Sequence, residues 1–151
     1  MRYLNKIVFI NSAAIRYSEV QLDGNIHLIG TQGVGKSTIL RAILFFYNAD
    51  TQRLGIPVEK KSYQDYYFPY ADSSIIYEVA REDGWFTVLS YKTMNRICYR
   101  FIASPYRPDL FIDEEGAPYP SDRIRSVLDK NGIKYSGAIS TYERSEERRV
   151  G

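Results

Sequence analysis

Apolar runs in the first thirty residues are short and separated by polar or turn-forming residues, a pattern typical of strands. Ile7–Ile10 and Ser18–Leu22 each predict a strand. Asp23, Gly24 and Asn25 form a turn sequence, and a third strand is predicted over Ile26–Ile29. A small sheet therefore opens the chain.

From Lys36 to Tyr47 the apolar residues recur at helical spacing instead of in short runs. Arg41 is the only charged residue after Lys36 in this stretch, so we expect a helix that is buried on most sides. From Thr51 to Ser74 the pattern becomes irregular and rich in tyrosine, and Gly and Pro interrupt it. We interpret this segment as a long loop or lobe over the sheet.

The second half of the chain begins with three strand-like runs, Ser74–Val79, Trp85–Tyr91 and Arg96–Ala103. Glu82, Asp83 and Gly84 supply a turn between the first two runs, so these strands predict an antiparallel meander. A short strand is expected at Leu110–Ile112, which extends this antiparallel lobe over about residues 74–113. A helix is then predicted with Ser121 as its N-cap, and Asn131 and Gly132 end it.

Composition restricts the class of protein but does not indicate a function. The chain of 151 residues has the length and apolar content of one globular domain, and 20 basic residues nearly balance 18 acidic ones. Any attraction to nucleic acid would therefore come from a local patch. Cys98 is the single cysteine and no segment is long enough to cross a bilayer, so we expect a cytoplasmic protein without a membrane partner.

The strongest chemical motif lies between the third strand and the first helix. Residues 30–37 match the phosphate-binding pattern G-x-x-x-x-G-K-[ST], and a threonine follows it. Glycines let successive backbone N–H groups face a phosphate at the positive end of the helix. Lys36 is expected to bridge the β- and γ-phosphates as the catalytic cation, and the Ser37 hydroxyl is expected to bind Mg²⁺. The predicted site for ATP and Mg²⁺ consists of Gly30, Thr31, Gln32, Gly33, Val34, Gly35, Lys36, Ser37 and Thr38.

Hydrolysis also needs a carboxylate on Mg²⁺ and usually a second one that orients water. Asp113 and Glu114 are the candidates, because they follow the apolar residues Leu110–Ile112. The alternative is a polar hairpin turn over Glu114–Gly116, which the nearby prolines favour. Arg16, expected in the loop after the first strand, is a further candidate for nucleotide contact, with an ordinary exposed loop residue as the alternative.

The order of these parts resembles the amino-terminal half of the head domain in the SMC, MukB, SbcC, RecF and RecN group of ABC-type ATPases. The resemblance rests on the first strand, Arg16, the hairpin over Ser18–Ile29, the phosphate-binding loop with its helix, and the antiparallel lobe. Gly30–Gly33 and the tyrosine-rich lobe are more similar to the MukB-like ATPases of bacterial chromosome-organising and plasmid-defence complexes. The fold class implied is α/β, a P-loop NTPase with an antiparallel β lobe.

This resemblance implies that residues 1–144 are one part of an ATPase head. The run of charged residues at the end of the sequence separately predicts that residues 145–151 are a non-native or disordered tail. The resemblance further implies that the complete protein hydrolyses ATP and acts on DNA, whereas this piece alone does not hydrolyse it. The expected partners are the carboxy-terminal half of the same head, a second head in a homodimer, accessory subunits and DNA. Two other classes stay open: a self-contained small P-loop NTPase or kinase, and the ATPase subunit of an ABC transporter.

Overall fold

The computed structural model of the chain describes residues 3–22, 26–29, 36–48, 64–94 and 96–140. Its core is a sheet of seven strands in the order β3-β2-β1-β4-β5-β6-β7, and every neighbouring pair is antiparallel. The elements are β1 Tyr3–Ser12, β2 Ile15–Leu22, β3 Ile26–Ile29, α1 Lys36–Asn48, β4 Ser74–Arg81, β5 Gly84–Thr93, β6 Arg96–Ile102, the 3₁₀ turn η1 Pro108–Leu110, α3 Ser121–Lys130 and β7 Ile139–Ser140.

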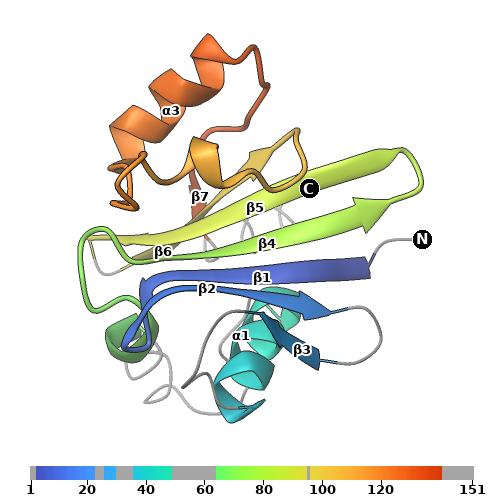
Figure 1. Cartoon of the computed structure of the whole chain (residues 1–151), viewed down its shortest axis with the longest axis vertical. Helices are drawn as coiled ribbons and strands as arrows, with labels where there is room; N and C mark the ends of the chain where they lie inside the picture. Colours follow the sequence, from blue (N-terminus) through green and yellow to red (C-terminus); the bar gives the residue numbers. More distant parts are fainter. Residues whose placement is uncertain (1–2, 23–25, 30–35, 49–63, 95, 141–151) are drawn as a thin grey trace, which may run out of the picture.

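Two layers cover the sheet from opposite sides, with α1 on one side and α3 on the other (Figure 1). Ile39 and Ala42 of α1 belong to one buried cluster, together with Ile7 and Phe9 of β1. The opposite cluster contains the neighbouring Val8 and Ile10 of β1, along with the buried side chains of α3. Because side chains alternate across a strand, a strand covered on both faces has a continuous apolar run, which explains the sequence Ile7–Ile10.

A β-bulge near the start of β1 adds a polar link between strands. The pairing of β1 with β4 shifts between Leu4 and Lys6, which leaves Asn5 as the extra residue. The Asn5 side-chain amide donates a hydrogen bond of 2.8 Å to the carboxylate of Glu78 in β4, which is buried. The other carboxylate oxygen of Glu78 accepts a bond of 2.7 Å from the backbone N–H of Tyr106. This buried carboxylate therefore fastens the segment after β6 to the sheet.

A second link to the same segment comes from β2. The hydroxyls of Tyr17 and Tyr106 lie 2.7 Å apart, and the Tyr106 ring stacks on Phe111 with centroids separated by 5.6 Å. Burial raises the pKa of Tyr106 far above its ordinary value, and the pKa of Tyr17 is raised for the same reason. Both phenols therefore stay protonated, and keep the shared hydrogen bond, to a higher pH than exposed tyrosines would.

Apart from the strand at 110–112, the predicted strands and the first helix are confirmed, with longer bounds for β1, β2, β4 and β5, and so is the turn between β4 and β5. Three expectations were wrong. Residues 110–112 form no strand, because η1 covers Leu110 and Ile112 makes only an isolated bridge to Pro118. Ser121 is the first residue of α3 and not its cap, since Pro120 holds the N-cap position. Residues 64–67 are helical, although an irregular segment was expected over Thr51–Ser74.

The burial predicted for α1 holds for five of its seven described side chains, which are buried or partly buried. Ile39 and Ala42 are fully buried, but the Leu40 side chain is 49% exposed and Arg41 is exposed too. The helix therefore presents one face to the sheet and leaves an apolar side chain uncovered. The turn at 23–25, residues 49–63 and the tail at 145–151 lie outside the described residues.

Candidate nucleotide site

The phosphate-binding motif lies between an edge strand and a helix. Strand β3 ends at Ile29 and α1 begins at Lys36, so the predicted order of strand, loop and helix is confirmed on both sides of the loop. The loop residues, Gly30, Thr31, Gln32, Gly33, Val34 and Gly35, lie outside the described part of the chain. For Lys36 and Ser37 the structure gives the helical backbone and not the side chains. The first residue of the motif with a described side chain is therefore Thr38.

Thr38 is held by two consecutive tyrosines from far along the chain. The Tyr67 hydroxyl donates a hydrogen bond of 2.6 Å to the backbone carbonyl of Thr38, and the hydroxyls of Tyr66 and Thr38 lie 3.3 Å apart. The two tyrosine rings pack edge to face, with centroids 4.9 Å apart. Burial raises the pKa of Tyr67 well above its ordinary value, which keeps this donor protonated. We call Tyr66 and Tyr67 the tyrosine brace.

The tyrosine brace also contacts the hairpin between β1 and β2. The backbone N–H of Ala13 at the hairpin turn donates to the carbonyl of Tyr66 at 3.2 Å. A second connection follows a few residues later, where the Ser73 hydroxyl donates to the carbonyl of Asn11. Residues 64–73 therefore link the hairpin turn to the first turn of α1. This one short segment fixes the position of the hairpin turn relative to the helix.

Arg16 lies on this hairpin, although not in the loop expected from the sequence. It belongs to β2, one residue after the strand begins, and its side chain is exposed. The hairpin turn is tight, since Ser12 pairs directly with Ile15, and both Ala13 and Ala14 have positive φ angles, of 51° and 62°. The turn puts Arg16 on the same hairpin that the tyrosine brace fixes.

Asp113 and Glu114 lie in the other layer of the molecule. The preceding residue pair, Phe111 and Ile112, packs in the cluster on the α3 side of the sheet, whereas α1 packs on the opposite side. One oxygen of the Asp113 carboxylate accepts bonds from the backbone N–H groups of Glu115 at 2.8 Å and Ala117 at 2.9 Å. The alternative of a polar turn is thus confirmed, and the sheet separates Asp113 from α1.

The described residues contain no group of three histidine, cysteine or acidic side chains that could hold a metal ion. Among those same residues, no helix combines the length and apolar character required to cross a membrane.

The tyrosine brace is the part of this region that the sequence did not reveal. Its hydrogen bonds join residues 28 and 29 positions apart, a separation for which periodicity carries no information. The available indication was the run Tyr66-Tyr67-Phe68 in a segment that was otherwise polar. Three adjacent aromatic residues rarely stay in solvent, and here Tyr67 and Phe68 are both 1% exposed.

Comparison with known proteins gives a family. The model of the family described as "Protein of unknown function (DUF3584)" matches residues 11–145, which is most of the chain, and the chain belongs to this family. Neither the curated proteins nor the solved structures yield a match.

Proposed function

We propose that the chain binds ATP with Mg²⁺ at Gly30–Thr38 as the amino-terminal part of a P-loop ATPase head. The observation that carries this proposal is the complete motif G-x-x-x-x-G-K-S between a strand and a helix. The helix N-terminus supplies backbone N–H groups and a favourable dipole, and Lys36 adds a full positive charge beside them. Together these groups suit a triphosphate and its metal ion.

The tyrosine brace supports the same proposal by fixing the helix that carries the motif. A phosphate site built on backbone N–H groups works only if those groups are held in place before the ligand arrives. Tyr67 binds the carbonyl of Thr38, one residue after the expected Mg²⁺ ligand Ser37. The brace therefore acts as a positioning element for the nucleotide site.

Substitution of Lys36 by Ala tests the nucleotide site. We expect calorimetry to show binding of Mg-ATP and Mg-ADP by the original chain and none by Lys36→Ala, while the circular dichroism spectra of the two proteins agree. Lys130→Ala is the matched control, because it removes the same charge from the exposed end of α3 on the other side of the sheet. Equal binding by Lys36→Ala and the original chain would refute the assignment.

We further propose that the complete protein is an SMC-like ATPase with two associating heads that acts on DNA. The order of the first strand, Arg16, hairpin, motif and antiparallel lobe supports this, as does the position of β3 at the edge of the sheet among the described strands. An edge strand has unpaired N–H and C=O groups, which suit added strands from the other half of the head. Association of two heads through bound ATP would couple hydrolysis to DNA contact.

The DNA part of the proposal requires the complete protein with its partner subunits. We expect duplex DNA to raise the rate of ATP hydrolysis at low salt and to do so less as salt increases, because phosphate contacts weaken with ionic strength. The rate per head should also rise with protein concentration. An ATP hydrolysis rate that depends neither on DNA nor on protein concentration would contradict the paired-head proposal. It would not affect the proposal that the chain binds nucleotide.

A further inference from the structure

Tyr66 is an exposed tyrosine beside the first turn of the helix that carries the phosphate-binding motif. Its side chain is 48% exposed, whereas the next two side chains, Tyr67 and Phe68, are buried. Residues 64–67 are helical, so consecutive side chains there point in different directions. Tyr67 therefore packs in the core, while the hydroxyl of Tyr66 stays accessible to a ligand in solvent.

The backbone and the ring of Tyr66 are both held in place. Its carbonyl accepts a hydrogen bond of 3.2 Å from the backbone N–H of Ala13 at the β1–β2 hairpin turn. Its ring packs edge to face on Tyr67, with centroids 4.9 Å apart, and Tyr67 is itself bonded to the carbonyl of Thr38. The Tyr66 side chain is therefore oriented before a ligand arrives, which reduces the entropy that binding costs.

The hydroxyl of Tyr66 lies beside the hydroxyl of Thr38. The two oxygens are 3.3 Å apart, which is longer than the roughly 2.7–2.8 Å that is usual between hydroxyls, so their mutual bond is weak. Each hydroxyl has one proton to donate, and the pair loses little when both protons turn to a stronger acceptor. A single anionic oxygen about 2.7 Å from each of them fits two donors at this separation.

The beginning of α1 is the place where the motif predicts the phosphates. Lys36, Ser37 and Thr38 are its first three residues, and the N–H groups of a first turn have no acceptor within the helix. This first turn contains no acidic side chain that could occupy those groups. Its positive end is therefore free of internal competition for an anion, and the two paired hydroxyls are next to it.

We propose that Tyr66 contacts the nucleotide directly, by donating a hydrogen bond from its hydroxyl to a phosphate oxygen beside Thr38. This inference rests on the proposed function, because it needs a nucleotide at the motif. The two tyrosines of the brace then have separate roles. Tyr67 is buried and positions the helix, whereas Tyr66 is exposed and binds the ligand from a segment 28 residues further along the chain.

Tyr66→Phe tests this contact, because it keeps the ring on Tyr67 and removes the hydroxyl. Calorimetry should show Mg-ATP binding weaker by about tenfold, the low end for a hydrogen bond to a charged group, since water competes at a half-exposed site. The same fold-change is expected for Mg-tripolyphosphate, which has three linked phosphates and no nucleoside. The unfolding free energy should stay the same, in contrast to Tyr67→Phe.

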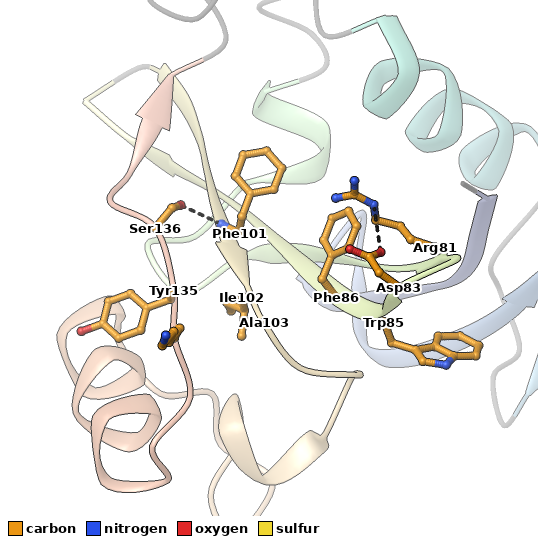
Figure 2. Close-up of a pocket in the computed structure, with 11 residues that line it drawn as sticks. Arg81, Asp83, Trp85, Phe86, Phe101, Ile102, Ala103, Tyr135 and Ser136 are labelled. Carbon is orange, nitrogen blue, oxygen red and sulfur yellow. Dashed lines mark hydrogen bonds and ion pairs between the residues drawn. The ribbon is translucent and has the colours of Figure 1, made fainter. Parts of the chain in front are cut away.

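Two other tyrosines serve as controls. Tyr70→Phe removes a hydroxyl from the same segment, where the Tyr70 side chain is 63% exposed. Tyr135→Phe removes a hydroxyl from a groove on the α3 side of the sheet (Figure 2), where it donates to the carboxylate of Asp129 at 2.9 Å. Both variants should bind Mg-ATP with the affinity of the original chain.

The outcomes separate this inference from the proposed function. Normal Mg-ATP binding by Tyr66→Phe, together with loss of binding by Lys36→Ala, would overturn the Tyr66 contact and leave the nucleotide site in place. A loss confined to Mg-ATP, with Mg-tripolyphosphate binding unchanged, would assign the hydroxyl to the nucleoside and overturn the phosphate contact. Absence of Mg-ATP binding by the original chain would refute the proposed function and this inference with it.

Discussion

Removal of the Tyr67 hydroxyl should measure how firmly the tyrosine brace holds the nucleotide-binding helix. Tyr67 is 1% exposed, and its ring packs against Phe9 with centroids 6.5 Å apart, so Tyr67→Phe keeps the packing and deletes the bond to the Thr38 carbonyl. In a helix that carbonyl also accepts a bond from the N–H four residues later, so it keeps a partner. The expected loss of unfolding free energy is therefore about 0.5–1.5 kcal/mol, the net value of one internal hydrogen bond.

Urea denaturation followed by circular dichroism gives this difference, and a loss of about 1 kcal/mol corresponds to a melting temperature lower by about 2–4 °C. Tyr66→Phe is the matched control. Its side chain is 48% exposed and its hydroxyl contact with Thr38 is longer, at 3.3 Å, so its cost should be close to zero. Calorimetry should also show weaker Mg-ATP binding by Tyr67→Phe. The reasoning fails if Tyr66→Phe costs more than Tyr67→Phe, or if neither change is measurable.

Other substitutions test separate parts of the structure. Ala14→Gly should raise the unfolding free energy by up to about 1 kcal/mol in a melting experiment, because Ala14 is held at a φ angle of 62° that favours glycine; a loss of stability would contradict the turn geometry. Asp113→Ala should lower the unfolding free energy by about 1–2 kcal/mol, because two hydrogen bonds of the turn are lost, and Asp113→Asn should lower it less. Neither change should alter the background ATP turnover of this chain. ATP hydrolysis that Asp113→Asn removes would instead support a self-contained ATPase. The unfolding free energy should fall as pH rises above about 10, because Tyr106 loses its proton there in the unfolded chain while its raised pKa keeps it protonated in the folded state. Urea titrations at several pH values measure this dependence, and Tyr106→Phe should flatten it.

Local pattern predicted the strands of this fold well because each strand is defined by its own residues. The runs Ile7–Ile10 and Ile75–Tyr77 are buried on both faces and therefore appear as continuous apolar segments. The turn at Glu82–Gly84 was equally clear, since Gly84 has a φ angle of 136° that other residues rarely adopt. The motif residues Lys36 and Ser37 were expected at the start of a helix, and α1 begins there.

The errors arose where distant parts of the chain decide the local structure. Leu110 and Phe111 look like a strand by composition, but they lie beyond the end of β6 at Ile102 and pack with Tyr106 and α3. The tyrosine brace depends on a segment that returns to α1 from beyond residue 63. Arg100 reads as an ordinary polar residue in the middle of a strand, and its burial follows only from the later segment that covers it.

The exposure of Leu40 in α1 supports a further covering element. Most of the described side chains of this helix are buried or partly buried, but Leu40 is 49% exposed although its neighbour Ile39 is fully buried. On the same sequence segment, β3 is the edge strand among the described strands and leads directly into the motif. An exposed apolar side chain and an edge strand on the same sequence segment suit a surface that packs against further strands and helices. The proposed second half of the head would cover both features at once.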